Sequence, residues 1–210
     1  YALIEIGLTD QVAAGLESQN ELVHVGALVA LDQLNAASVG GEHLVRALRG
    51  VRGSTRRKAR WILGNRPNLG TALLPVLRSW LLDSSESGFD STELADLFSK
   101  LSANPSVADL LGEMLTDGNS TTEAKRMIVG MMIRSDDQAA VESWMTGIVA
   151  LIQSRDTHLL NEATRAAAHL ANDKLDRRSL LKELMRLSVD TSVHLKERLV
   201  AIGVLVKHIE

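Results

Sequence analysis

Apolar residues recur along this chain at intervals of three and four, the spacing that places them on one side of an α-helix. Residues 22–35 and 137–153 show the pattern most clearly. The first stripe contains Val25, Leu28, Val29, Leu31 and Leu34. The second contains Ala140, Val141, Trp144, Ile148, Leu151 and Ile152. No segment keeps the two-residue alternation of a half-buried strand, so the sequence predicts an all-α protein.

Capping residues mark where the helices begin. An N-cap side chain accepts a hydrogen bond from a backbone amide of the first turn, and proline is tolerated at the first helical position. Pro105 is therefore expected to open a helix. We expect caps at Asp90, Ser120–Glu123, Asp136, Asp156, Asp176 and Thr191–Ser192.

The helical segments repeat. Large apolar residues late in successive helices lie 32, 68, 39 and 35 residues apart, and 68 is two units of 34 with the missing unit near Leu97. These anchors are Leu31, Leu63, Met131, Leu170 and Leu205. A two-helix unit cannot bury its apolar face alone, whereas stacked units form a continuous core. The spacing predicts a right-handed α-α superhelix, a HEAT-like solenoid of about six helix pairs. Successive pairs are expected to divide near residues 36, 66, 103, 135 and 174. Residues 155–156 are expected to separate the two helices of one pair.

We expect residues 1–210 to form one domain. The alternative is a hinge at residues 83–90, in the Ser-rich segment that ends the basic region. The start at Tyr1 without methionine and the apolar first and last helices predict a piece of a larger protein whose ends are covered or associate. No apolar run approaches the roughly 18 residues that span a bilayer.

Composition offers no reactive centre. The absence of cysteine excludes disulfides, thiolate nucleophiles, thiolate zinc sites and covalently attached c-type haem. The six histidines lack metal-ligand spacing, and we interpret them as surface or satisfied packing residues. No glycine-rich segment continues into a phosphate-binding loop. We therefore predict no catalytic, cofactor-binding or metal residue and no cofactor, and we expect the segment not to be an enzyme. No small-molecule substrate is indicated.

Charge is distributed unevenly along the chain. Residues 1–45 carry six acidic and no basic side chains, residues 46–82 carry nine basic and no acidic ones, and residues 83–123 carry nine acidic ones and Lys100. Stacked repeats turn such blocks into spatial bands. Either neighbouring repeats neutralise one another, or the basic band meets a partner. For a partner, the expected contacts are Arg56, Arg57, Arg60 and Arg66.

An anion- or nucleic-acid-binding module using residues 46–66 is an alternative. Trp61 beside Arg60 could then stack on a base. Two observations disfavour nucleic acid: the chain has a pI near 6.1, and Trp61 lies with Ile62 and Leu63 in an apolar run, which predicts a core position. Trp80 and Trp144 are likewise expected to fill the core.

Several runs of the chain form a recognisable ordered set. They are YALIEIG at 1–7, VALDQL at 29–34, RRKARWILGNRPNLGTAL at 56–73, ELADLFSKLSANPSVADLLGEML at 93–115 and EATRAAAHLA at 162–171. The set resembles the HEAT-repeat region of large exported membrane-bound dehydrogenase proteins of planctomycete-type bacteria. In that family a sugar-dehydrogenase-like β-propeller usually precedes the array, and a cytochrome c module with a CxxCH motif follows it.

The resemblance implies a non-catalytic scaffold and protein-interaction module that links the propeller to the cytochrome module. Its partners would be flanking domains of the same chain or another protein, and the implied location is the bacterial periplasm or cell envelope. This chain has no CxxCH motif, so no haem or catalytic residue carries over.

Overall fold

The computed structural model describes residues 9–34, 41–49, 53–134, 138–171 and 178–207. These residues form twelve α-helices and three short 3₁₀ helices, and none of them lies in a strand. The α-helices are α2 (Thr9–Ala14), α3 (Glu21–Gln33), α4 (Gly41–Leu48), α5 (Gly53–Asn65), α6 (Gly70–Leu82), α7 (Ser91–Leu101), α8 (Pro105–Thr116), α9 (Thr122–Arg134), α10 (Gln138–Ser154), α11 (Leu160–Leu170), α12 (Arg178–Val189) and α13 (Leu195–Val206). The 3₁₀ helices are η1 (Gly15–Glu17), η2 (Pro67–Leu69) and η3 (Ser84–Ser87).

The chain divides into two compact units, Tyr1–Asn104 and Pro105–Glu210. This boundary coincides with the repeat boundary predicted near residue 103. It does not fall at 83–90, where the alternative prediction placed a hinge, and η3 in that segment belongs to the first unit. That the whole chain behaves as one domain stays a prediction.

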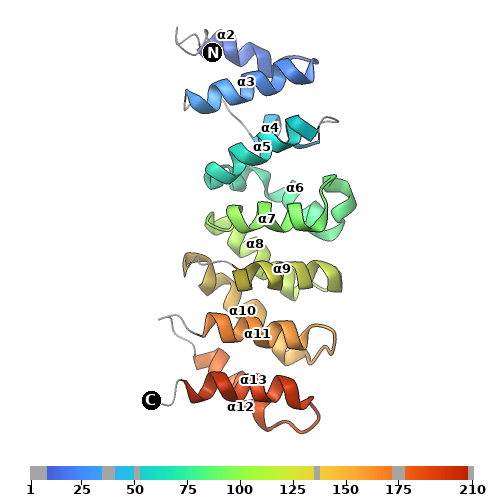
Figure 1. Ribbon diagram of the computed structural model, residues 1–210, viewed down its shortest axis with the longest axis vertical. Helices are drawn as coiled ribbons and strands as arrows, with labels where there is room; N and C mark the ends of the chain where they lie inside the picture. Colours follow the sequence, from blue (N-terminus) through green and yellow to red (C-terminus); the bar gives the residue numbers. More distant parts are fainter. Residues whose placement is uncertain (1–8, 35–40, 50–52, 135–137, 172–177, 208–210) are drawn as a thin grey trace. The chain divides into compact units, whose positions relative to one another are not determined.

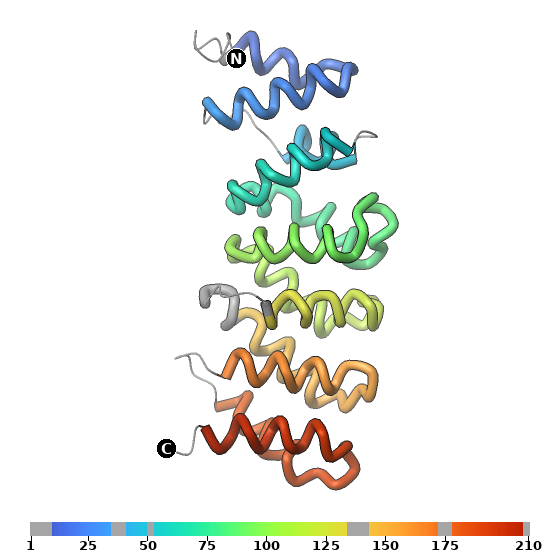
Figure 2. Tube along the Cα trace, viewed as in Figure 1, coloured from blue at the N-terminus to red at the C-terminus, as the bar shows by residue number. Residues whose placement is uncertain are grey.

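Each unit consists of helix pairs stacked in two layers. In the first unit α4 packs on α6, while α3, α5 and α7 pack in succession. In the second unit α8, α10 and α12 form one succession and α9, α11 and α13 the other. Figures 1 and 2 show this alternation within each unit. Helices that contact both their sequence neighbour and the helix one repeat away define a helical repeat, so the all-α repeat prediction is confirmed.

The predicted pair boundaries agree with the helices on either side. The residues near 66 and 103 lie between α5 and α6 and between α7 and α8, and 155–156 separates α10 from α11 inside a pair. The boundaries near 36, 135 and 174 fall outside the described residues, in the intervals between α3 and α4, α9 and α10, and α11 and α12. The HEAT type of the repeat stays a prediction.

The core confirms two of the three tryptophan assignments. Trp80 and Trp144 are 0% and 1% exposed. Trp61 was expected in the core and is instead 55% exposed, so that prediction was wrong. Its neighbours Ile62 and Leu63 are fully buried, and successive helical residues turn by about 100°. Three consecutive apolar residues therefore cannot all face the core, and Trp61 is the one left outside.

Three of the expected helix starts are confirmed. Asp90 caps α7 in a capping box, with its Oδ1 accepting from the Glu93 amide at 2.8 Å. Thr121 Oγ1 accepts from the Ala124 amide at 3.1 Å, one residue before α9 begins, and Pro105 opens α8.

Two of the expected N-caps were wrong. Asp156 accepts from the His158 amide in the turn before α11, whose N-cap is Leu159. The Thr191–Ser192 segment lies in a similar turn, in which Asp190 is the acceptor, and α13 begins only after His194. In both cases the polar side chain stabilises a turn that precedes the helix. The expected caps at Asp136 and Asp176 lie outside the described residues.

Candidate interaction surfaces

Helix α5 and the turn after it position the four arginines predicted to contact a partner. Arg56 donates from Nη1 to the Gly88 carbonyl at 2.5 Å, and Arg60 Nη1 lies 3.0 Å from Glu93 Oε1. Arg66 forms an ion pair with Asp32, Nε to Oδ1, at 2.5 Å and also donates to the Asp32 carbonyl. Three of the four arginines therefore connect α5 and the following turn to neighbouring repeats of the first unit. Two of these contacts, Arg60–Glu93 and Arg66–Asp32, are ion pairs between repeats of the kind that mutual neutralisation predicts, whereas Arg56 meets a carbonyl.

Polar contacts of this kind recur at about one repeat of sequence separation. Arg60–Glu93 spans 33 residues, Arg66–Asp32 spans 34 and Asn104–Thr71 spans 33. In the second unit Ser143 donates to Asp109 at 2.5 Å over 34 residues, and Arg126 reaches both the His158 carbonyl and Glu162. Since each contact joins equivalent places in successive pairs, these contacts help to set the register of the stack.

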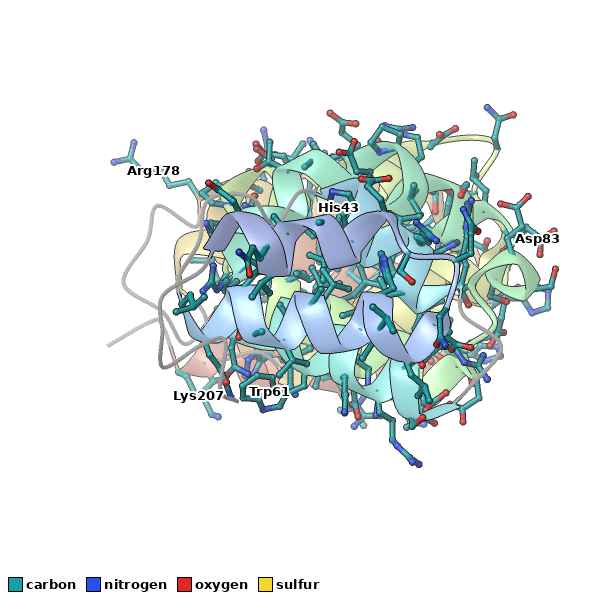
Figure 3. All side chains as sticks on the ribbon, turned by 90° about the horizontal axis from the view of Figure 1, so that it is seen from above. His43, Trp61, Asp83, Arg178 and Lys207 are labelled. Atoms are coloured by element: carbon teal, nitrogen blue, oxygen red, sulfur yellow. The ribbon has the colours of Figure 1, made fainter. Side chains whose placement is uncertain are left out.

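The outward face of α5 carries a different set of side chains, which we call the Trp61 surface: Arg57, Lys58 and Trp61. All three are exposed, and Arg57 and Lys58 make no ion pair within the part of the chain that the structure describes. Arg57 and Trp61 are four residues apart and so share one side of the helix. Figure 3 shows Trp61 on the outside of the molecule. An indole flanked by cations suits ligands with carboxylates, phosphates or flat aromatic groups.

Lys100, which is not among the predicted contact residues, extends this surface. A Cβ at Gly64 of α5 would lie 2.8 Å from Lys100 Cδ, so the lysine stem crosses the helix at this glycine. Gly64 is one turn from Trp61. The sequence contained a usable indication, because Lys100 is the one basic residue in an acidic block and lies 36 residues after Gly64.

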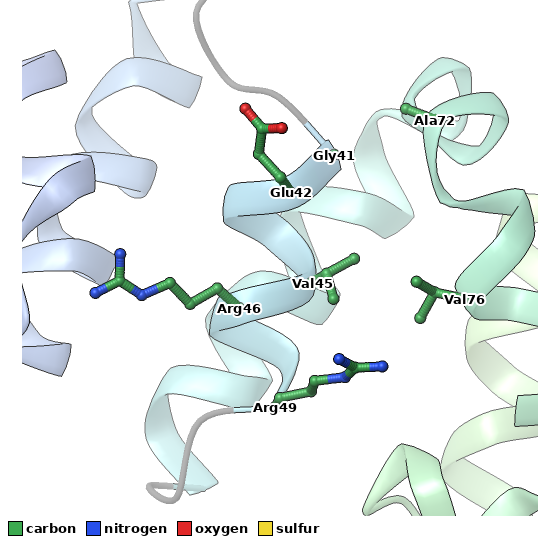
Figure 4. Close-up of a pocket in the computed structure, with 7 residues that line it drawn as sticks. All are labelled: Gly41, Glu42, Val45, Arg46, Arg49, Ala72 and Val76. Carbon is green, nitrogen blue, oxygen red and sulfur yellow. The ribbon is translucent and has the colours of Figure 1, made fainter. Parts of the chain in front are cut away.

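A groove lies between α4 and α6, with a volume of about 620 Å³ (Figure 4). Val45 and Val76 line it from opposite helices, and Arg49 extends beside them. Arg46 points the other way and donates to the Leu16 and Ser18 carbonyls. A Cβ at Gly41 would lie 2.8 Å from Ala72 Cβ, so α4 and α6 approach each other closely there.

A smaller groove of about 320 Å³ lies between α8 and α10 in the second unit. Ser143 donates to Asp109 there at 2.5 Å, and Glu113 is a second carboxylate in the lining. No histidine is among the residues that line this groove. The Ser143–Asp109 hydrogen bond joins α10 to α8 across this groove.

The buried histidine of α3 has a structural role. His24 is 2% exposed, its Nδ1 lies 2.7 Å from the Leu16 carbonyl, and its Nε2 lies 3.1 Å from the His43 carbonyl. Its ring therefore lies between α3, η1 and α4, with each nitrogen at hydrogen-bond distance from a backbone carbonyl. Among the residues described, no group of three or more histidine, aspartate or glutamate side chains could hold a metal ion. None of the described helices combines the length and apolar character needed to cross a membrane.

Two aspartates have perturbed acidities, and both belong to turns. The hydroxyl and amide of Ser85 donate to Asp83 and hold the pKa of that carboxyl below its usual value. Ser192 does the same for Asp190, whose pKa is lowered further by the nearby Arg155. Because both side chains cap exposed turns, the shifts reflect local structure and do not indicate a catalytic group.

No family model and no curated protein matches this chain. Among solved structures, two engineered proteins from the Northeast Structural Genomics Consortium are similar to it, each with 18% identity over 94% of this chain. The alignments cover 94% and 96% of those chains, with TM-scores of 0.44 and 0.42.

Proposed function

We propose that this chain is a non-catalytic helical-repeat scaffold that docks other protein modules through the Trp61 surface. The observation that supports this is that the basic side chains of α5 fall into two groups, one bound within the unit and one exposed. Arg56 and Arg60 bind neighbouring repeats of their own unit, whereas Arg57, Lys58 and Trp61 remain exposed. Exposed tryptophan and arginine are the residues that most often dominate the energy of protein interfaces.

The resemblance noted in the sequence supports a more specific form of this proposal. In it, the chain is a HEAT-repeat segment of an exported bacterial protein. It holds a sugar-dehydrogenase-like propeller and a cytochrome c module in a fixed relation, so that electrons can pass between them. Stacked helix pairs suit this task because each repeat packs on the next, so the array forms one continuous element between the two modules.

The test begins with the gene that encodes this chain. Segments encoded before Tyr1 and after Glu210 are expressed separately and titrated against the chain by calorimetry. We expect one of them to bind, with affinity reduced at least about tenfold by Trp61→Ala or by Arg57→Ser. Arg56→Ser is the matched control, because Arg56 already donates to Gly88.

Two results would count against the scaffold. If neither segment binds, or if no such segment exists, the chain does not link modules of one protein. If a segment binds equally well to wild type and to both variants, docking does not use the Trp61 surface.

A second candidate is an anion- or nucleic-acid-binding module. The exposure of Trp61 favours it, since a buried indole could not stack on a base and this one can. A single-stranded oligonucleotide is titrated at two salt concentrations while the emission of Trp61 is recorded. Nucleic-acid binding predicts quenching and an affinity that falls steeply with salt. Absence of quenching at low salt would exclude this function.

A further inference from the structure

The groove between α4 and α6 presents charged and apolar groups in a fixed order along its α4 wall. Glu42, Val45 and Arg49 line it at intervals of three and four residues, so they lie on one side of the helix. Glu42 is in the first turn of α4, and Arg49 comes directly after its last residue. The wall therefore carries a carboxylate at one end, an apolar centre, and a guanidinium at the other end.

The centre of the groove is apolar on both walls. Val45 of α4 and Val76 of α6 face each other across it, and Ala72 lies one turn before Val76 (Figure 4). The two valines are only partly buried, and Ala72 is exposed. An aliphatic side chain placed between them would therefore remove apolar surface of both helices from water, which favours binding in proportion to the area covered.

Arg49 supplies the charge that specifies the ligand. Its side chain is exposed and makes no hydrogen bond or ion pair within the part of the chain that the structure describes. Arg46 differs, because it donates to the Leu16 and Ser18 carbonyls. Residues 46–82 contain nine basic and no acidic side chains, so neither α5 nor α6 offers a carboxylate to Arg49. The complementary group is a carboxylate on the ligand.

Glu42 restricts the ligand to one negative end. Its carboxylate is 83% exposed and lies 3.8 Å from the His43 ring. The seven residues from Glu42 to Arg49 correspond to a rise of about 10.5 Å along a helix. A polyanion lying along the groove would therefore approach the Glu42 carboxylate and be repelled by it. A ligand with a single carboxylate beside an apolar group avoids this repulsion.

The spacing of the apolar centre and the cation fits an extended peptide. Val45 and Arg49 are four residues apart, a rise of about 6 Å along the helix. Alternate side chains of an extended chain lie on the same face, roughly 6.5–7 Å apart. An aliphatic residue and an acidic residue separated by one residue therefore match the distance from Val45 to Arg49.

We propose that the groove between α4 and α6 binds an extended peptide segment of a partner protein. An aliphatic side chain of the segment lies between Val45 and Val76, and the carboxylate of an acidic residue two positions away pairs with Arg49. Recognition of extended peptides through pockets for alternate side chains is a recurring mode of binding. The groove shares no residue with the Trp61 surface, so the proposal goes beyond the proposed function and does not depend on it.

The experiment titrates the full chain, with isotope-labelled valine methyl groups, with three short synthetic peptides. The first has isoleucine and glutamate two positions apart in a glycine–serine sequence. The second has glutamine in place of the glutamate, and the third has serine in place of the isoleucine. Methyl NMR spectra detect weak binding, and Val45→Ala and Val76→Ala assign the two signals.

We expect the first peptide to shift the methyl signals of Val45 and Val76. It should bind about two- to fivefold more tightly than the glutamine peptide, the contribution of one partly exposed ion pair. It should bind at least about fivefold more tightly than the serine peptide, which lacks the apolar side chain.

Arg49→Gln should weaken binding of the first peptide about two- to fivefold and leave binding of the glutamine peptide unchanged, because only the first peptide pairs with Arg49. Arg57→Gln is the matched control, since Arg57 is also exposed but lies on α5, outside the groove. Circular dichroism verifies that both variants keep the helical content of the wild type. Trp61→Ala should leave peptide binding unchanged, which separates this proposal from the function proposed for α5.

Five results would overturn the proposal. The first is the absence of any methyl shift at millimolar peptide, and the second is equal binding of the glutamate and glutamine peptides. The third is an equal loss with Arg49→Gln and Arg57→Gln, which would indicate general electrostatic attraction. The fourth is a dimer in sedimentation that Arg49→Gln dissociates, which would assign the groove to a second copy. The fifth is binding of isovalerate as tight as that of the first peptide, which would assign the groove to small carboxylates.

Discussion

Replacing Gly112 by alanine should destabilise the second unit, although alanine is the better helix former. Gly112 lies inside α8, where a Cβ would be 2.6 Å from the Ser143 carbonyl oxygen and 3.3 Å from its carbon. These are backbone atoms of α10, so no side chain can turn away to make room. Ordinary contact would require α8 and α10 to separate by roughly 0.8 Å, and such overpacking typically costs about 1–3 kcal/mol.

Gly130→Ala is the matched control. Gly130 also lies inside a helix of the second unit, α9, and a Cβ there meets nothing within 4 Å. Alanine should therefore stabilise α9 by about 0.5–1 kcal/mol through helix propensity alone. The same gain applies at Gly112 and offsets part of the overpacking cost, which at the middle of the two ranges leaves a net loss of about 1 kcal/mol. For a chain of this size that loss corresponds to a decrease in Tm of about 2–4 °C.

Thermal and urea unfolding followed by far-UV circular dichroism measures both variants. The emission of Trp144 assigns the transition to the second unit, because this buried residue follows Ser143 in α10. If Gly112→Ala is as stable as Gly130→Ala, the α8–α10 contact is looser than described, and the argument that glycine sets the distance between the two helices fails.

Three other perturbations test separate features. Trp61→Phe should remove the long-wavelength, iodide-quenchable part of the emission and leave that of the two buried tryptophans; a spectrum that keeps it would mean that Trp61 is not exposed. Asp190→Asn should be less stable than wild type at neutral pH. Folding lowers the pKa of Asp190, so the extra stability of the wild type is fully present above pH 3.8, the ordinary pKa of the group. It is lost as pH falls through the lower pKa of the folded state, and urea unfolding at a series of acid pH values measures that loss. Arg66→Met should lower the free energy of unfolding in urea by about 1.5–3 kcal/mol, because it leaves the Asp32 carboxylate, 9% exposed, without its partner. Arg57→Met, at an exposed position, should change it by less than about 0.5 kcal/mol. Equal effects of the two substitutions would refute the Arg66–Asp32 pairing.

The helix periodicity and the repeat length were predictable because they depend on local chemistry. Apolar stripes such as Val25, Leu28 and Leu31 require a helix with one buried side, and capping residues such as Asp90 with Glu93 act within a single turn. The interval of about 34 residues between anchors predicted the pairs because each repeat buries its apolar face in the same way.

The tertiary structure alone decided which polar and aromatic residues remain available. Arg56, Arg57 and Arg60 are equivalent in sequence, but only the packing of α5 against α7 and its neighbours directs Arg60 to Glu93 and leaves Arg57 exposed. The exposure of Trp61 depends on how α5 is turned about its own axis against the core. That orientation decides which of Trp61, Ile62 and Leu63 faces solvent. Long-range contacts between repeats set that angle, and they join residues more than thirty positions apart, beyond the reach of any local pattern.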